Sequence, residues 1–389
     1  MSGLSATGDG IARTLLPLAA AAAPHAEMLV GVVQTAARLP WLVASLPAGR
    51  AADGRGPSVV LAVGLALKLG GLLLIATAAL TSTWGLLVPA ALAAATGEVL
   101  FETATQVSVV HDFTESDRPR TNSALQATQV SLGQFVGPTV AGLFWQWNAL
   151  VSLASALSAQ IGAGAARRRW EARRPPVGSR SSAAGPRSGW GAGLRALWSS
   201  DALRATTVIG TVSMLAYGLW SVCFVLHVTG PAGLGASSAV FGLLVGCPAI
   251  GALLGSRVFP PLLPRLSALA GLLAMIVGQL GLFVPAALGA PAVIVACGLV
   301  IYGLGLAGWS AGVLAFRQSV VPSEVYGQAT GAYRFVSWGA SPLGAALGGV
   351  LVARAGTSVG MLVGVALVAL QIPLVPWARS LRSYRGGRA

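Results

Sequence analysis

The chain has 389 residues, of which 55% are hydrophobic and only 9% are charged. Because a soluble domain carries roughly 25% charged residues, this composition excludes an ordinary soluble protein and predicts an all-α polytopic membrane protein. The formal net charge of +14 does not indicate a nucleic-acid partner, since the Arg residues fall in short loops between apolar runs and form no basic face on a soluble unit.

Apolar runs of bilayer-spanning length follow one another along the whole chain. The first run has a short apolar part, because Asp9 and Arg13 lie near its start; either this helix begins almost at Met1 or its true start lies upstream. The pattern predicts twelve transmembrane helices in two six-helix bundles. We place the runs at residues 4–24, 27–49, 58–80, 84–106, 123–144 and 147–165, and then at 205–229, 236–259, 268–288, 290–316, 327–353 and 358–377.

A basic segment rich in Pro, Gly and Ser separates the two blocks, beginning with Arg167-Arg168-Arg169. With a cytoplasmic N-terminus, the inner loops hold nearly all of the loop Arg residues and the outer loops hold only Arg354. This asymmetry predicts a multi-pass protein of the inner (cytoplasmic) membrane with both termini in the cytoplasm. The expected parts are an N-terminal bundle at 1–166, a cytoplasmic linker at 167–204, a C-terminal bundle at 205–378 and a basic tail at 379–389.

The loop between the second and third runs places Asp53 between Arg50 and Arg55, after Gly49. A carboxylate between two guanidinium groups at a helix end can form a charge-assisted latch that is made and broken at the cytoplasmic mouth. A merely solvated loop explains the same residues equally well.

The fourth run carries Glu98, Glu102 and Gln106 at four-residue intervals, which predicts a polar stripe on one helix face. At about 1.5 Å per residue, Glu98 reaches the middle of the membrane, and Arg38 of the second run reaches a similar depth. An ionisable group at that depth indicates a functional role unless it forms a structural ion pair. We favour a proton- or substrate-linked role for Glu98, paired in one state with Arg38. For Glu102, which lies nearer the inner mouth, a functional role and a structural role are equally favoured, and Glu102 and Gln106 are included among the candidate residues of the proton-coupling site or substrate cavity. Asp9 is a second candidate for protonation, although Arg13 lies one turn away and can neutralise it.

The other polar candidates inside apolar runs are a lysine and several aromatic residues. For Lys68 in the third run we expect a packing or lipid-facing role, because a long lysine stem can extend toward the membrane surface. In the second half, aromatic side chains can bind a flat or amphipathic substrate, or they can form interfacial belts. The candidates for the cavity are Tyr217, Trp220, Tyr302, Tyr333 and Arg334.

Small residues and prolines recur at matching places in the two halves. Glycines four residues apart allow two helices to approach closely, and proline kinks a helix. Such a parallel repeat is typical of transporters in which two bundles rock about a site between them. The repeated residues are Gly133, Gly137, Pro138 and Gly142 in the fifth run and Pro342 and Gly344 in the eleventh, with the two prolines 204 positions apart.

No enzyme motif is present in the sequence. It lacks the His-Glu-x-x-His, phosphate-loop and Gly-x-Ser-x-Gly patterns. The three Cys residues lie inside apolar runs without paired spacing, and the three His residues are scattered at the ends of runs. We therefore expect no enzymatic activity, no metal and no cofactor.

Taken together, these residues resemble the major facilitator superfamily, and within it the exporters that include the enterobactin exporter and the macrolide efflux pumps. The resemblance covers essentially the whole chain. Its most specific stretch is Gly331-Ala-Tyr333-Arg334-Phe335-x-Ser337-Trp338-Gly339-Ala340-x-Pro342-Leu-Gly344. The Gly137-Pro138 run is similar to the superfamily's antiporter motif. The loop at 49–53 is similar to the superfamily's loop 2–3 motif, but Gly54 stands where an Arg is expected and Pro57-Ser58 replaces a basic pair.

The resemblance implies twelve helices, alternating access, and export of a small amphipathic molecule driven by proton antiport. Its implied partners are this substrate, protons and the lipid bilayer, and carriers of this kind usually work as monomers. Two alternatives of other classes stay open at this point: an uptake carrier or facilitator of the same fold, and a non-transporting membrane scaffold or sensor. A drug, a siderophore and a secondary metabolite fit the sequence equally well as substrates.

Overall fold

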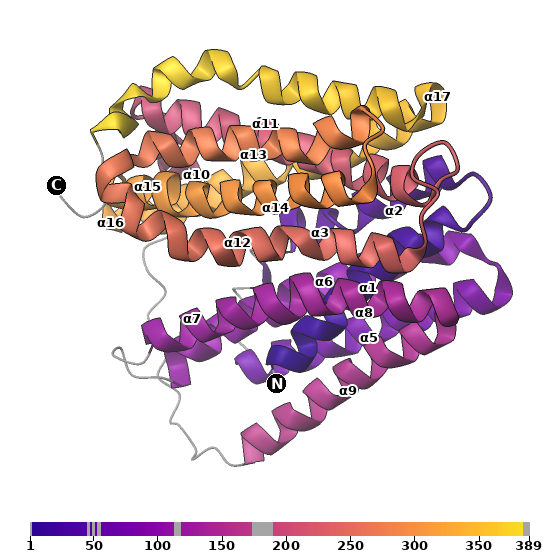
Figure 1. The fold of residues 1–389 in the computed structure, drawn as a ribbon. Coiled ribbons are helices and arrows are strands. Elements are labelled where there is room, and N and C mark those ends of the chain that lie inside the picture. The colour runs from indigo at the N-terminus through magenta and orange to yellow at the C-terminus, as the bar shows by residue number, and fades with distance from the viewer. Residues whose placement is uncertain are drawn as a thin grey trace. The chain divides into compact units, whose positions relative to one another are not determined.

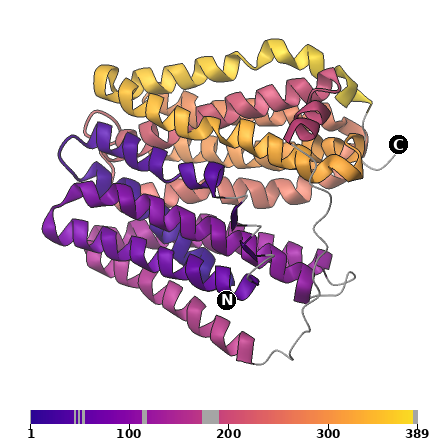
Figure 2. The same ribbon diagram turned by 180° about the vertical axis from the view of Figure 1, so that it is seen from behind.

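The computed structural model describes residues 2–44, 47–48, 51–52, 56–112, 118–172 and 190–383. Throughout these ranges the secondary structure is helical, and they contain no β-strand, which confirms the expected all-α fold. The chain divides into two compact units (Figures 1 and 2). Unit 1 comprises Met1–Pro24 and Ala36–Arg187, and unit 2 comprises His25–Thr35 and Ser188–Ala389.

Unit 1 is built around the first helix, α1, which packs against α8, η2 and α9, while α5 packs against α6. Gln129–Val136 is a π-helical stretch that leads directly into α8. The elements of this unit are α1 (Ser2–Ala21), α3 (Leu39–Val43), α5 (Pro57–Thr81), η1 (Trp84–Leu86), α6 (Leu87–Asp112), α7 (Arg118–Thr128), η2 (Gln129–Val136), α8 (Gly137–Trp147) and α9 (Ala149–Ala172).

Unit 2 is organised in the same way around α11, which packs against α17, η4 and η5, while α13 and α12 pack against α14. Nearly all of α2 also belongs to this unit, because Gly31 lies against Gly349 and the Gln34 amide donates to the Ser221 carbonyl at 3.2 Å. The elements are α2 (Ala26–Ala36), α10 (Trp190–Leu197), α11 (Asp201–Thr229), α12 (Ser238–Leu266), α13 (Ala268–Ala287), α14 (Ala292–Trp309), η3 (Ser310–Leu314), α15 (Ala315–Val320), α16 (Ser323–Tyr333), η4 (Arg334–Trp338), α17 (Ala340–Ala369) and η5 (Ile372–Arg382).

Eight helical stretches among the described residues are long and apolar enough to cross a membrane. The second predicted run is not one helix, because α2 ends at Ala36 and α3 begins at Leu39. Pro40 explains this break, since proline lacks an amide donor and disfavours helical geometry in the residue before it. The predicted eleventh and twelfth runs are separated at Gly356, where φ is 81° and ψ is 170°. The count of twelve spans stays a prediction.

One helix was not expected from the sequence. Residues 190–197, which we placed in the linker, form α10, and this helix packs against α16. Trp190, Leu194 and Leu197 recur at helical spacing, and Leu197 is fully buried. Leu194 is 38% exposed, so Leu197 is the residue of this stripe that the helix buries among those whose side chains are described.

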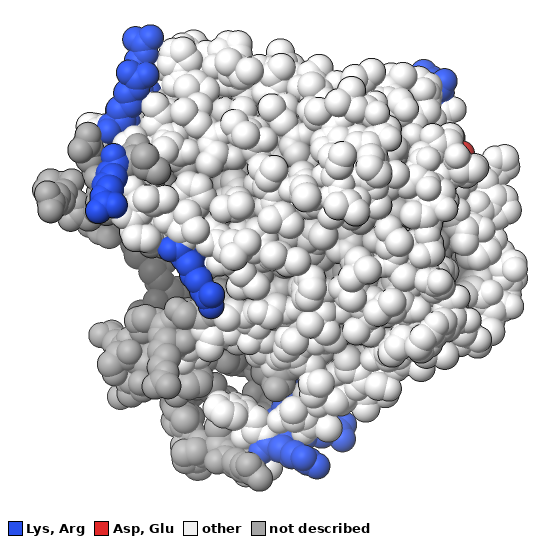
Figure 3. All heavy atoms as spheres, in the orientation of Figure 1, with Lys and Arg blue, Asp and Glu red and all other residues white. Residues whose placement is uncertain are grey.

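The surface in view is nearly free of charge (Figure 3). On that face the few Lys and Arg side chains lie at the edges, and the broad area between them is uncharged. This distribution fits helices whose sides contact lipid and whose ends contact water.

Candidate functional site

A buried ion pair joins α1 to α5 in unit 1. The Lys68 ammonium lies 2.7 Å from Asp9 Oδ2 and donates to Ser5 Oγ at 2.9 Å. Gln160 of α9 donates from its amide to Asp9 Oδ1 at 2.9 Å. Asp9 is 7% exposed, and Ser5, Lys68 and Gln160 are each 1% exposed. Both carboxylate oxygens of Asp9 therefore have a close donor, and the buried charge is paired.

The lipid-facing alternative for Lys68 needs a correction, whereas its burial agrees with a packing role. Its side chain is buried inside unit 1, and its ammonium lies 4.1 Å from the centre of the Phe101 ring. A lone cation at that depth is costly, so the chain pairs it with Asp9 instead of extending it to the membrane surface. Two signals in the sequence point to this arrangement. Lys68 is the only lysine in the chain, and Ser5 and Asp9 lie one helical turn apart.

Gly8 makes room for this cluster on α1. A Cβ at Gly8 would lie 2.6 Å from Gln160 Nε2, so any larger residue would push the amide away from Asp9. The Gly8-Asp9-Gly10 run thus places the carboxylate between two points of close helix contact.

Glu98 of α6 pairs with Arg13 of α1. The Arg13 Nη1 to Glu98 Oε1 distance is 3.7 Å, which is long for an ion pair. The Arg13 side chain is 47% exposed and the Glu98 side chain is 15% exposed. Arg13 also donates to the Asp9 carbonyl and to the Gly133 carbonyl, at 3.4 Å in each case. Arg13 therefore contacts Glu98 and two backbone carbonyls, and the Asp9 carboxylate has the Lys68 ammonium at 2.7 Å. Neutralisation of Asp9 by Arg13 stays a prediction.

The rest of the predicted stripe on α6 is present. The Gln106 amide donates to Glu102 Oε1 at 3.3 Å, as their four-residue spacing requires. Arg38 is the N-cap residue of α3, and α3 packs against α6. Pairing of Arg38 with Glu98 in another state stays a prediction. The candidate gate residues Gly49, Arg50, Asp53 and Arg55 lie outside the described residues.

The glycines of the fifth run bring two helices of unit 1 into close contact. A Cβ at Gly137 would lie 2.7 Å from Gly10 Cα, and a Cβ at Gly133 would lie 3.2 Å from the Ala6 carbonyl oxygen. Pro138 and Gly142 are buried on the same helix. The π-helical stretch immediately before Pro138 widens the helix where proline offers no amide hydrogen.

The eleventh run repeats these features in unit 2. Gly344 lies against Leu215 and Leu219 of α11, and Gly218 lies against Ser341. Another π-helical stretch, Arg334–Trp338, comes just before Pro342, whose carbonyl accepts from the Thr35 hydroxyl at 3.4 Å. The small residues and prolines that the sequence identified therefore lie at close helix contacts within both units.

Three of the five second-half candidates form one aromatic stack. Tyr217 lies 5.6 Å from Trp220 and 6.3 Å from Tyr302 between ring centroids, and Trp220 lies 4.5 Å from Phe224. The Trp220 Nε1 atom is buried and has no hydrogen-bond partner among the described residues. A buried indole N–H ordinarily has an acceptor, so this one is an exception. Trp220 and Tyr302 are each only 5% exposed, and the stack therefore lies in the interior of unit 2.

Tyr333 and Arg334 lie elsewhere in unit 2. The Arg317 guanidinium carbon lies 3.9 Å from the Tyr333 ring centre, and the Arg334 guanidinium lies over Trp338 at 5.3 Å. The Tyr333 hydroxyl lies next to Gly210, which is seven residues, or about 10 Å along α11, from Tyr217. The structure therefore does not bring Tyr333 and Arg334 into the stack.

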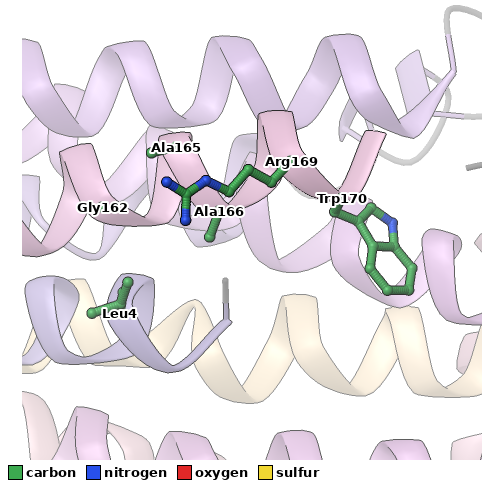
Figure 4. A pocket seen from close by; sticks show the side chains of 6 residues that line it. All are labelled: Leu4, Gly162, Ala165, Ala166, Arg169 and Trp170. Atoms are coloured by element: carbon green, nitrogen blue, oxygen red, sulfur yellow. The ribbon is translucent and has the colours of Figure 1, made fainter. Parts of the chain in front are cut away.

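A cavity of about 440 Å³ lies between α1 and α9 of unit 1 (Figure 4). Its lining is mostly small and apolar, and Arg169 is the only charged residue in it. None of the carboxylates described above lines it, so this cavity is separate from the charged cluster. The lining residues are Leu4, Gly162, Ala165, Ala166, Arg169 and Trp170.

Residues 1–345 match the family model described as Major Facilitator Superfamily. A comparison with curated protein sequences finds no match. Similar solved structures include a mutant of the nucleoside transporter NupG, with a TM-score of 0.71, 14% identity and 98% of both chains covered. A bacterial homologue of the iron transporter ferroportin, in an inward-facing state, has a TM-score of 0.71 and 15% identity over 97% of this chain and 96% of that chain.

A POT family transporter in complex with 5-aminolevulinic acid has a TM-score of 0.71 and 12% identity, covering 98% of this chain and 94% of that chain. Identities this low establish a shared fold and nothing about the substrate. The family model, by contrast, covers most of the chain and agrees with its helical fold. The chain therefore belongs to the major facilitator superfamily of membrane transporters.

Proposed function

We propose that the protein is a secondary active transporter that exports a small amphipathic molecule by proton antiport with alternating access. The motifs shared with the enterobactin exporter and the macrolide efflux pumps support export and suggest a drug, a siderophore or a secondary metabolite as substrate. In this proposal the protein works as a monomer in the cell membrane, with both termini in the cytoplasm.

The observation that carries the proposal is the contrast between two carboxylates of unit 1, the buried Asp9 and the partly buried Glu98. Asp9 is held on both oxygens, by Lys68 at 2.7 Å and by Gln160 at 2.9 Å. Glu98 has Arg13 at 3.7 Å, and Arg13 is half exposed. Exchange of a proton requires a carboxylate that can lose its counter-ion, and Glu98 meets this condition better than Asp9 does.

Protonation of Glu98 would remove its charge and with it the attraction to Arg13. A pairing that differs between two states is the condition for coupling proton binding to a conformational change. Arg38, on the helix segment that packs against α6, is the proposed partner of Glu98 in the other state. Asp9 assists by keeping Lys68 paired in the same bundle.

The aromatic stack in unit 2 is the proposed contact surface for the substrate. Stacked Tyr217, Trp220 and Tyr302 supply flat apolar rings, and the Trp220 N–H has no acceptor among the described residues. Trp220 and Tyr302 are each 5% exposed here, so in this proposal the substrate reaches them in another conformation of the transport cycle. An amphipathic molecule with an aromatic ring or a lactone carbonyl fits such a surface.

The test is transport in proteoliposomes under an imposed pH gradient, with enterobactin and a macrolide antibiotic as probes and an entrapped pH-sensitive dye to follow protons. The wild-type protein should exchange at least one probe for protons. Glu98→Gln should abolish this exchange while the protein still folds and inserts, because the amide cannot take up a proton. Thr96→Ala on the same helix, where the hydroxyl donates to the Leu92 carbonyl at 2.7 Å, is the matched control and should leave exchange intact.

The same assay decides between export and the other classes. Probe movement in the direction of the proton gradient would indicate an uptake carrier, and movement without a proton signal would indicate a facilitator. Proton-coupled exchange by Glu98→Gln at the wild-type rate would refute the assignment of Glu98.

A further inference from the structure

The two units contain the same three-helix polar contact, in a charged form in unit 1 and in a neutral form in unit 2. In unit 1 the contact joins Ser5 of α1, Lys68 of α5 and Gln160 of α9, with Asp9 between Lys68 and Gln160. We call this set the polar staple of unit 1.

The corresponding set in unit 2 consists of Ser213, Gln279 and Gln371. The side chains of Gln279 and Gln371 exchange two amide hydrogen bonds, each 3.1 Å long, and the Ser213 hydroxyl donates to Gln371 Oε1 at 3.3 Å. All three residues are at most 4% exposed. This polar staple of unit 2 joins α11 and α13 to the segment after α17, and it contains no charged group.

The two staples occupy equivalent positions of the internal repeat. Ser213 follows Ser5 by 208 positions. Gln279 follows Lys68 by 211 positions, and Gln371 follows Gln160 by the same 211 positions. The same offset of 208 relates Gly10 to Gly218, two glycines that both lie at close helix contacts. Gly97, which lies against α5, likewise corresponds to Gly305, which lies against α13.

This correspondence shows what unit 2 has in place of each charge. Tyr217 stands at the position of Asp9 and Gln279 at the position of Lys68. Ser221 stands at the position of Arg13, and Leu306 at the position of Glu98. All four of these charged residues of unit 1 are therefore replaced by neutral residues at the equivalent places.

A neutral staple is thus sufficient to hold the three helices of such a bundle together. Burying Lys68 and Asp9 at that place costs desolvation energy that an amide pair avoids. The chain otherwise uses Arg as its basic residue, so the compact ammonium of Lys68 is a local exception. The need to hold the helices together therefore does not explain why Asp9 and Lys68 are charged.

We infer that the Asp9–Lys68 pair is a functional element that sets the electrostatic environment of the proton-exchanging Glu98, and that Lys68 is a positioning residue of the coupling site. This inference rests on the proposed proton coupling at Glu98. Arg13 links Asp9 to Glu98, because it lies 3.7 Å from Glu98 Oε1 and donates to the Asp9 carbonyl at 3.4 Å. Lys68 lies against Gly97, the residue before Glu98, and Glu102 follows Glu98 by one turn of α6.

These are the charged groups that face the cluster from the described parts of α1, α5 and α6, and α9 contributes the neutral Gln160. Glu102, one turn further along α6, contributes the same charge in both protonation states of Glu98. With Asp9, Arg13, Lys68 and Glu98 ionised, the group of these four residues has no net charge. One proton on Glu98 leaves it with a single positive charge. Removing the charge of Lys68 makes the net charge around Glu98 more negative, and removing the charge of Asp9 makes it more positive.

The test is an infrared titration of the protonated carboxyl group of Glu98 in lipid, which needs no transported substrate. The carboxyl band is assigned by its loss in Glu98→Gln. Lys68→Gln leaves an extra negative charge, so protonation should occur at higher pH, by about one unit. Asp9→Asn leaves an extra positive charge, so the midpoint should move by about one unit to lower pH.

The double variant Asp9→Asn/Lys68→Gln copies the neutral staple of unit 2, so it should fold and return the midpoint close to that of the wild type. Lys68→Arg keeps the charge and should also keep the midpoint. Gln279→Leu is the matched control in unit 2, which should lower thermal stability without moving the midpoint.

Opposite shifts that cancel in the double variant support the inference. It is overturned if neither charge change moves the midpoint, if both move it in the same direction, or if Lys68→Arg behaves like Lys68→Gln. Glu98→Gln can abolish proton-coupled exchange while the titration midpoints of Lys68→Gln and Asp9→Asn stay at the wild-type value. In that case this inference fails and the proposed function does not. If the carboxyl band survives in Glu98→Gln, the proposed function fails at its proton site.

Discussion

Replacing Gly137 with alanine tests whether α1 and α8 depend on contact between their backbones. The new Cβ would lie 2.7 Å from Gly10 Cα and 2.9 Å from the Thr7 carbonyl oxygen. Ordinary contacts begin at 3.4 Å, so the two helices would have to separate by about 0.7 Å. Both neighbours are backbone atoms and cannot rotate away as a side chain would. We expect a steric cost of about 1–3 kcal/mol.

Alanine also favours a helix over glycine by about 0.5–1 kcal/mol, which opposes the steric cost. Gly70→Ala in α5 shares this gain, but nothing lies within 4 Å of its Cβ position. The difference between the two variants therefore isolates the steric term. At about 2–4 °C for each kcal/mol, Gly137→Ala should melt several degrees below Gly70→Ala in detergent. Equal melting temperatures would refute the claim that this contact is tight.

Two further predictions concern the stability of unit 2. Gly356→Ala should destabilise the protein by about 1–3 kcal/mol in thermal unfolding, because a φ of 81° with a ψ of 170° is accessible to glycine almost alone; no loss would mean that the chain bends elsewhere. Gln279→Leu should cost about 1–3 kcal/mol by leaving the Gln371 amide unsatisfied, and Gln279→Leu/Gln371→Leu should recover part of it. A double variant less stable than either single variant would contradict that reasoning.

The membrane class and the helical fold could be predicted from the sequence because both follow from local properties. Long apolar runs with few charges can satisfy their backbone in a bilayer only as helices or as closed barrels. The break at Gly356 is also local and falls between the expected runs 327–353 and 358–377, whereas the break before Pro40 inside the run 27–49 was not anticipated. Glu98, Asp9 and the Gly137-Pro138 run were recognised because charges, glycines and prolines stand out in an apolar helix.

The partners of these residues could not be predicted in the same way, because they come from helices far apart in the sequence. From the sequence, depth in the membrane allowed Glu98 to pair with either Arg38 or Arg13 and did not decide between them. Lys68 and Gln160 approach Asp9 only when α5 and α9 pack around α1. The grouping of His25–Thr35 with unit 2 likewise depends on a contact between Gly31 and Gly349.

By itself, the sequence determined that this chain is a helical membrane protein with the motifs of one transporter superfamily. Composition and hydrophobic periodicity are properties of each helix taken separately. Every segment of the sequence therefore indicates a membrane-spanning helix independently of the others. Only the tertiary structure decided which charges neutralise one another, and that the charged cluster of one unit has a neutral counterpart in the other. Such pairing depends on which helix faces come into contact, and helix faces are matched by packing over the whole bundle.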